Sequence, residues 1–89
     1  MPLVDQEALD ELVAGNIRAI RARLKMTQQE LADELGWSRP VVGQLENGNR
    51  RITLADAYAL SAALDVHLGD LLQGAPPEVF QRFGIERRG

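Results

Sequence analysis

Apolar residues recur every three or four positions along the first quarter of the chain, which is the spacing of one buried helix face. They fall at positions 9, 12, 13, 17, 20 and 24 and predict a first helix over residues 6–24. Asp5 is a suitable N-cap for this helix. Gly15 and Asn16 weaken the middle of the span, which leaves open a bend there or a division into two pieces.

A second helix is predicted over residues 27–36 by the signals at its two ends. Thr27 and Glu30 have the spacing of a capping box. Gly36 stands where a helix commonly ends in left-handed backbone. The residues expected on its buried side are Leu31, Ala32 and Leu35.

A third helix is predicted from Ser38 to about Glu46, with Asn47-Gly48 as a strong stop signal. It contains two poor helix formers. Pro40 is tolerated because the first turn leaves its N–H position unpaired anyway. Gly43 lies in the middle, where glycine costs roughly 1 kcal/mol against alanine. The second of these choices requires a reason other than helix formation.

The second half of the chain predicts two more helices and a tail. A fourth helix over residues 53–64 is so dense in apolar residues that it is expected to pack centrally. A short fifth helix is expected around residues 68–72. Residues 74–77 then break the chain, Pro77 can begin a further helical turn, and residues 84–89 are expected to fray. The apolar residues of that turn are Val79, Phe80 and Phe83.

The composition agrees with one small all-α domain. Of 89 residues, 45% are hydrophobic but only 4% are aromatic, so the core must be built mainly from Leu, Ile, Val and Ala. The chain has no cysteine, which excludes disulfides, thiol nucleophiles and thiolate metal sites and fits a reducing compartment. No apolar run approaches the length of a membrane span, and the acidic start of the chain does not resemble a signal peptide. A cytoplasmic protein without a membrane partner is expected.

The charge is unevenly distributed. The formal net charge is −3, yet residues 16–51 hold seven bases against four acids. Among Asp, Glu, Lys and Arg, residues 1–15 and 52–74 contain only Asp and Glu. Because local potential governs a binding surface more than total charge, a nucleic-acid partner remains compatible with this acidic chain.

The sequence lacks the residues that most enzymes need. A single histidine, no cysteine and no paired inward carboxylates leave no catalytic triad and no metal cluster. No glycine-rich phosphate loop is present, and His67 is expected to be an ordinary surface residue. We therefore expect neither an enzyme, nor a cofactor, nor a bound metal.

Residues 28–47, QQELADELGWSRPVVGQLEN, have the organisation of a helix-turn-helix. Two short helices are separated by about three residues with glycine in the turn. Ala32 is expected where the helices cross most closely, and Trp37 is expected to pack in the core rather than to stack on bases. Because residues three and four apart share a helix face, positions 39, 40, 43 and 44 form a free outer face.

The segment TQQELADELGWSRPVVGQLENG, followed by ITLADAYALSAALDVHLGDLL, resembles the phage-repressor-like, or XRE-type, transcriptional regulators. The resemblance implies a five-helix, lambda-repressor-like DNA-binding domain over residues 12–73. Residues 1–11 would then extend the first helix. Residues 74–89 would form a C-terminal tail that supplies a further turn of helix or a dimer contact. His67 departs from the serine, threonine or proline that this family has before its last helix, which leaves the cap of that helix open.

The resemblance also implies that the third helix, residues 38–46, enters the major groove. The residues that would face the bases are Arg39, Pro40, Gly43 and Gln44. Arg39 suits the O6 and N7 of guanine, Gln44 suits the edge of adenine, and Pro40 offers apolar contact to a thymine methyl. Gly43 either permits close approach of the backbone to DNA or is a tolerated surface glycine. The family pattern favours Ser38 as the N-cap, whereas the restriction before proline would suit Arg39 outside the helix.

Backbone contacts and one ion pair complete the site that the resemblance implies. The residues expected to contact phosphates are Gln28, Ser38, Asn47, Asn49, Arg50 and Arg51. Asn47 is alternatively a simple helix C-cap, whereas Arg50 and Arg51 are favoured because a loop rarely needs adjacent arginines for folding. Arg21 and Glu46 are expected to form a partly buried structural ion pair, with a phosphate contact by Arg21 as a secondary alternative.

Three functions are compatible with these features. The first is a transcriptional regulator, most simply a dimeric repressor of a palindromic operator on double-stranded DNA. The second is an antitoxin that represses its own operon and binds a toxin through its tail. The third is a protein-interaction module that kept the fold. The homodimer surface is expected on the fifth helix with Val79, Phe80 and Phe83, or on the N-terminal segment with Leu9, Leu12 and Val13.

Overall fold

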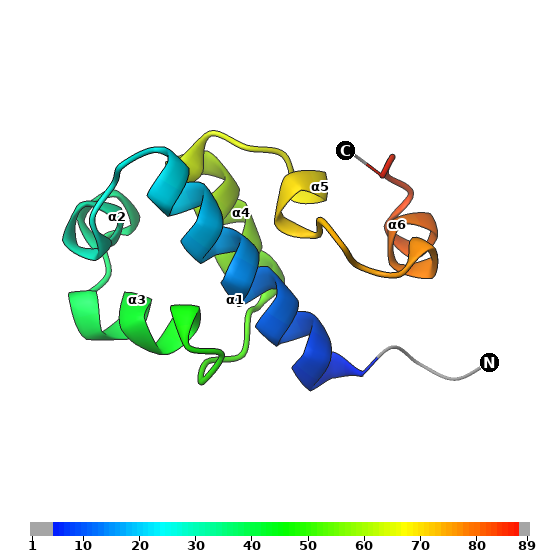
Figure 1. Ribbon diagram of the computed structural model, residues 1–89, viewed down its shortest axis with the longest axis horizontal. Coiled ribbons are helices and arrows are strands. Elements are labelled where there is room, and N and C mark those ends of the chain that lie inside the picture. Colours follow the sequence, from blue (N-terminus) through cyan, green and yellow to red (C-terminus); the bar gives the residue numbers. More distant parts are fainter. Residues whose placement is uncertain (1–4, 88–89) are drawn as a thin grey trace.

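The computed structural model describes residues 5–87 and folds them into six helices without a strand (Figure 1). The helices are α1 (Gln6–Arg23), α2 (Gln28–Leu35), α3 (Arg39–Glu46), α4 (Leu54–Leu64), α5 (Leu68–Leu71) and α6 (Pro77–Phe83). The predicted all-α class is confirmed, and five of the helices match the predicted spans closely. The described residues measure 40 × 23 × 20 Å, with α2 and α3 at one end of the long axis and α6 at the other.

α1 is one continuous helix of 18 residues, so the bend or break considered near Gly15 does not occur. The Asp5 carboxylate accepts hydrogen bonds from two backbone N–H groups of the first turn, which confirms the predicted N-cap. The Asn16 side chain makes contacts outside its own helix. Its side-chain amide donates to the carbonyls of Leu71 (2.8 Å) and Gln73 (2.9 Å) and so ties α1 to the end of α5.

The ends of α2 and α3 follow the local signals. Thr27 and Glu30 form the predicted capping box, and Gly36 ends α2 with a φ of 70°. Ser38 is the N-cap residue of α3 by its extended backbone, and Arg39 is already helical, which decides between the two candidate caps. The Ser38 hydroxyl makes no capping hydrogen bond, so Ser38 acts as the N-cap only through its extended backbone conformation.

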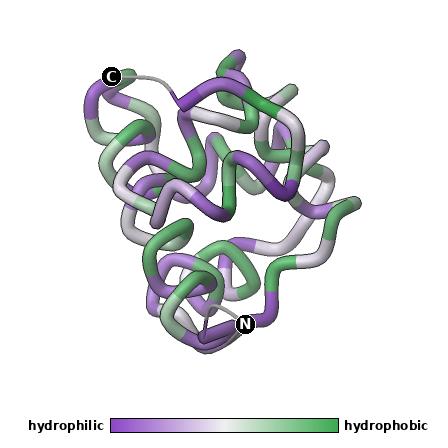
Figure 2. Tube along the Cα trace, turned by 90° about the vertical axis from the view of Figure 1, so that its right-hand side faces the viewer, coloured by the Kyte–Doolittle hydropathy of each residue, from purple (hydrophilic) through white to green (hydrophobic). Residues whose placement is uncertain are grey.

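The core lies where α1, α4 and α5 meet the helix-turn-helix pair. Hydrophobic and hydrophilic stretches alternate along the chain in Figure 2, as expected for helices that bury one face. Ala32 is fully buried between the packed helices α2 and α3, and Trp37 packs against the core as predicted. The largest fully buried side chains are Ile17, Leu31, Val42, Leu45, Leu60 and Leu71.

The C-terminal tail is more ordered than the sequence suggested. α6 makes two turns, and its Val79 and Phe80 side chains are buried in the same core as the rest of the domain. Ile85 also rests against this core, and its N–H donates to the Phe80 carbonyl at 3.1 Å. The prediction of a frayed end at 84–89 is therefore wrong for Gly84 and Ile85, whereas residues 86–87 are exposed and lie outside the helices, and residues 88–89 lie outside the described residues.

The start of the chain shows a similar division. Residues 6–11 form the first turns of α1, while residues 1–4 of the expected N-terminal extension lie outside the described residues. Within residues 5–87, none of the helices combines the length and the hydropathy needed to cross a membrane.

Candidate nucleic-acid interface

The outer face of α3 carries side chains that the fold does not use. Arg39, Pro40 and Gln44 are exposed, as the three- and four-residue spacing predicted. Within residues 5–87, the side chains of Arg39 and Gln44 take part in no hydrogen bond or ion pair of the protein. A guanidinium and a carboxamide that have no partner in the protein are available to bind another molecule.

Gly43 lies on the same face and has no structural requirement for glycine. Its backbone is helical rather than left-handed, and a Cβ added there would meet no atom within 4 Å. A side chain would therefore fit, and α3 would gain helix stability from it. Folding alone does not account for this glycine.

The opposite side of α3 ends at Glu46, whose carboxylate is almost completely buried, with 2% of the side chain exposed. Arg21 of α1 meets it with two hydrogen bonds, at 2.6 Å from Nε and at 3.0 Å from Nη2. The hydrogen bonds to Glu46 raise the pKa of Arg21 above its ordinary value, although burial acts in the other direction. Both residues of the expected ion pair are thus held in place at the junction of α1 and α3.

Glu46 also binds Gln28 of α2, which was predicted to contact a phosphate. The side-chain amide of Gln28 donates to Glu46 Oε1 at 3.1 Å. An amide nitrogen carries two hydrogens, so one of them remains after this bond. Glu46 therefore fixes the direction of Gln28 and still leaves it a donor.

Arg18 belongs to the same junction and was not among the predicted residues. Its Nη1 donates to the Glu46 carbonyl at 2.8 Å, at the C-terminal end of α3. A cation there stabilises the negative end of the helix dipole. The spacing could have revealed it, because Arg18 and Arg21 are one turn apart on the same side of α1.

Arg50, in the loop after α3, is held in place by contacts with two residues outside the loop. The Arg50 guanidinium lies over the Trp37 ring, with its central carbon 4.9 Å from the ring centroid, which is the geometry of a cation–π contact. Its Nη2 also lies 3.4 Å from Asp56 Oδ1. Its Nε is buried without a hydrogen-bond partner among the described groups, so the aromatic ring supplies part of the stabilisation that a polar partner would give.

Arg51 is also in contact with the protein, but it is far more exposed, with 73% of its side chain accessible. Its guanidinium donates to Gln6 Oε1 at 2.6 Å and lies 3.5 Å from Asp10 Oδ2. Arg50 and Arg51 each join the loop to another helix, so the argument that a loop rarely needs adjacent arginines for folding does not single them out as phosphate contacts. Their phosphate contacts stay a prediction.

The remaining predicted phosphate contacts are Ser38, Asn47 and Asn49. All three are exposed, and none of their side chains has a hydrogen bond within the described part of the chain. Asn47 is the C-cap residue of α3 and caps it through its backbone N–H, which donates to the Gly43 carbonyl. Its side chain takes no part in this cap. Ser38 precedes α3 and Asn47 and Asn49 follow it, so these residues lie at the two ends of that helix.

Comparisons with known proteins agree with the fold described above. A helix-turn-helix family model (HTH_3) matches residues 17–71. The chain is 40% identical over 71 residues to an uncharacterized HTH-type transcriptional regulator, YqaE, from Bacillus subtilis (strain 168). The match covers 79% of this chain but 61% of that relative, so the chain spans less than two thirds of the relative's length.

Two crystal structures show the same fold. The hypothetical transcription factor NHTF from Neisseria superimposes with a TM-score of 0.70 and 30% identity over 93% of both chains. The restriction-modification controller protein C.AhdI from Aeromonas hydrophila gives a TM-score of 0.67 and 30% identity. That match covers 72% of this chain and 97% of the controller protein.

Proposed function

Because the chain belongs to the helix-turn-helix family of DNA-binding transcriptional regulators, we propose that it reads double-stranded DNA in the major groove with α3. The observation that carries the proposal is the outer face of α3, where Arg39 and Gln44 have no partner within the described part of the protein. Relatives in this family are named as regulators and control proteins rather than enzymes. This role fits a protein located in the cytoplasm.

Base recognition in this proposal depends on four residues of α3. Arg39 donates two hydrogen bonds to the O6 and N7 of guanine, and Gln44 pairs with adenine. Pro40 packs against a thymine methyl. Gly43 lets the helix backbone approach the floor of the groove. These contacts select sequence, because the major groove presents a different donor and acceptor pattern for each base pair.

Phosphate contacts fix the position of α3 without selecting sequence. Gln28 offers its remaining N–H beside the N-terminus of α2, where the helix dipole favours an anion. Arg50 and Arg51 contribute positive charge from the loop. The other contributors are Ser38, Asn47 and Asn49. In this scheme, Arg50 and Arg51 both stabilise the fold and contact the DNA backbone.

The regulator binds as a homodimer to a palindromic operator and acts most simply as a repressor. Two-fold symmetry places two α3 helices in successive major grooves, about 34 Å apart. A dimer doubles the number of base contacts, which a single eight-residue helix supplies only sparsely. Occupying the operator is then sufficient to block other proteins there.

The alternatives receive less support from the structure. An antitoxin would require a segment free to bind a toxin, and the tail has buried Val79 and Phe80 in its own core. A protein-interaction module that has lost DNA binding has no need for free Arg39 and Gln44 side chains beside a basic loop. The regulator explains both features.

Enrichment of binders from a random duplex pool, followed by fluorescence anisotropy at two salt concentrations, tests the proposal. A palindromic site should emerge, and Arg39→Ala or Gln44→Ala should each reduce discrimination at one base pair by about 1–3 kcal/mol. Weak, salt-dependent binding should persist in both variants. Exposed Arg82 and Gln81 on α6 provide matched controls, because Arg82→Ala and Gln81→Ala should leave the preference unchanged. Failure to enrich any sequence would refute the proposal.

A further inference from the structure

The acidic start of α1 lies against the basic loop that follows α3. Residues 5–11 contain four carboxylates and neither Lys nor Arg. Gly48 of the loop lies so close to this part of α1 that a Cβ added to it would stand 3.3 Å from Glu11 Cγ. The family model matches residues 17–71, so one side of this contact lies outside the matched domain.

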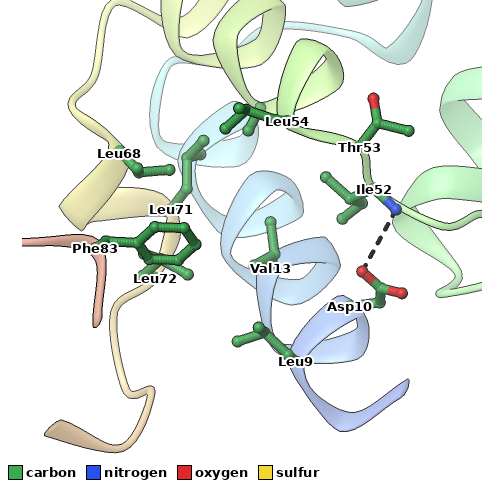
Figure 3. A pocket seen from close by; sticks show the side chains of 11 residues that line it. Leu9, Asp10, Val13, Ile52, Thr53, Leu54, Leu68, Leu71, Leu72 and Phe83 are labelled. Carbon is green, nitrogen blue, oxygen red and sulfur yellow. Dashed lines mark hydrogen bonds between the residues drawn. The ribbon is translucent and has the colours of Figure 1, made fainter. Parts of the chain in front are cut away.

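Asp10 joins α1 to the loop through both of its carboxylate oxygens. Its Oδ1 accepts a hydrogen bond from the Ile52 N–H at 3.4 Å (Figure 3). Its Oδ2 lies 3.5 Å from Arg51 Nε. One turn earlier on α1, Gln6 Oε1 accepts a hydrogen bond from Arg51 Nη2 at 2.6 Å. Only 19% of the Asp10 side chain is exposed, so its carboxylate has a fixed position beside the guanidinium.

Gln6 and Asp10 occupy the edge of Arg51 that an anion would otherwise use. The Nε and Nη2 hydrogens of an arginine point in the same direction, and this edge binds carboxylates and phosphates with two parallel hydrogen bonds. Arg21 uses the same two nitrogens to bind the two oxygens of Glu46. A DNA phosphate that binds Arg51 through this edge must therefore take the place of Asp10.

The contact between Asp10 and Arg51 is loose enough for such an exchange. The separation of 3.5 Å between Nε and Oδ2 is longer than the roughly 2.8 Å of a strong charge-assisted hydrogen bond. The Arg51 side chain is 73% exposed, so it can turn towards another partner. Arg50 lies on the Trp37 ring and lacks this freedom. Arg51 is therefore the loop arginine that can exchange its carboxylate for a phosphate.

We propose that Asp10 is an internal competitor for the DNA backbone, which holds Arg51 in the free protein and lowers the affinity for DNA through it. When DNA binds, a phosphate replaces the carboxylate at Arg51, while Asp10 keeps its hydrogen bond to the Ile52 N–H. The charge of Asp10 opposes this exchange, because the carboxylate loses its cation and repels the incoming phosphate.

The inference rests on the proposed function, in which Arg51 contacts a phosphate, and it adds a residue that weakens that contact. Phosphate contacts do not depend on sequence. Asp10 should therefore lower the affinity for every duplex by about the same factor and leave the base preference of α3 unchanged.

Asp10→Asn separates the charge of this residue from its hydrogen bond to the loop. The asparagine carbonyl can still accept from the Ile52 N–H, whereas its amide group is a donor and cannot pair with a guanidinium. Asp65→Asn is the matched control, because it removes the same charge from an exposed aspartate at the opposite end of α4 from the loop. Asparagine also suits the left-handed backbone of Asp65, whose φ is 53°. Circular dichroism verifies that both variants are folded.

The first readout requires no DNA. The NMR signal of the Arg51 Nε–H should shift in Asp10→Asn, which loses the carboxylate beside that nitrogen, and should stay in place in Asp65→Asn. An Arg51 signal that is the same in all three proteins would overturn the inference, because Asp10 would then not hold the guanidinium.

The second readout is fluorescence anisotropy with a duplex of arbitrary sequence. At low salt, Asp10→Asn should bind about two- to fivefold more tightly than the wild type, which is the range for an exposed ion pair. This gain should shrink as added salt screens the charge. It should be largely lost when Arg51→Ala is also present, and Asp65→Asn should give a smaller gain.

Two kinds of failure are distinguishable in this experiment. If the wild type binds the duplex but Asp10→Asn binds no more tightly, the inference is overturned and the regulator stands. A gain that is equally large in the Arg51→Ala background, or in Asp65→Asn, has the same consequence, because Asp10 would then not act through Arg51. If neither the wild type nor any variant binds a duplex, the regulator itself is refuted, and the inference with it.

Discussion

The outer face of α3 and the contact-rich junction formed by its last residue and the following loop lie only a few residues apart but differ completely in their surroundings. Arg39 and Gln44 on the outer face have no side-chain partner among residues 5–87. At the junction, Glu46 binds two other side chains, Arg50 lies on Trp37 and contacts Asp56, and Arg51 contacts the start of α1.

The difference separates two kinds of functional residue. A side chain without a structural role can change without cost to folding, so sequence preference can vary at Arg39 and Gln44 independently of the scaffold. A side chain such as Arg50 has its position fixed by the fold before any ligand arrives. In the proposed function, the free face of α3 reads the bases and the loop arginines, already held in place by the fold, contact the DNA backbone.

The largest effect is expected from breaking the junction at Glu46. Glu46→Ala should lower the free energy of unfolding by about 3 kcal/mol, because it leaves the mostly buried Arg21 guanidinium without its carboxylate. Urea denaturation followed by circular dichroism measures this loss. Glu34→Ala, at an exposed glutamate of α2, should change stability by less than about 0.5 kcal/mol. Equal losses in the two variants would show that the junction does not support the fold.

A smaller effect should distinguish the two loop arginines. Arg50→Ala should reduce stability by about 1 kcal/mol through the lost cation–π contact, whereas the more exposed Arg51 should contribute less. Trp37 is the only tryptophan, so its fluorescence reports directly on the removal of the Arg50 side chain. Each variant should also lower the slope of log affinity for DNA against log salt by about 0.9 if it contacts one phosphate. Unchanged tryptophan emission in Arg50→Ala would contradict the stacked geometry.

The smallest effect on stability is expected at Gly43, on the outer face of α3. Gly43→Ala should raise the free energy of unfolding by roughly 0.5 kcal/mol, because alanine is the better helix former and the site is open. The same variant should weaken DNA binding if the backbone approaches the groove closely. Gly36→Ala is the control, because its left-handed backbone makes alanine destabilising there. A stabilised Gly43→Ala variant with full affinity would make Gly43 a tolerated surface residue.

Much of the fold was predictable because its signals are local. The Thr27 capping box, the left-handed Gly36 and the stop after Glu46 involve residues close together in sequence, and all three occur as predicted. The course of α6 was not predictable in the same way. A turn that starts with Pro77 becomes a stable helix only because Val79 and Phe80 find space in a core built by distant residues.

The candidate site divides along the same line. The exposed face of α3 follows from helix periodicity, and the Arg21–Glu46 pair followed from the family resemblance. The contacts of Arg51 with Gln6 and of Asn16 with Leu71 join residues 45 and 55 positions apart, which no local pattern reveals. Asn16 is an example, since asparagine is a weak helix former, yet its side chain here makes tertiary hydrogen bonds that tie α1 to the end of α5.

The most direct test of the account is an NMR titration of the labelled protein with the enriched duplex. If the account is right, the largest changes in amide chemical shift will fall on α3, on Gln28 and on the loop as far as Arg51. Changes concentrated on α4, α5 and α6, with Arg39 to Gln44 unaffected, would show that the free face of α3 is not the DNA-reading surface.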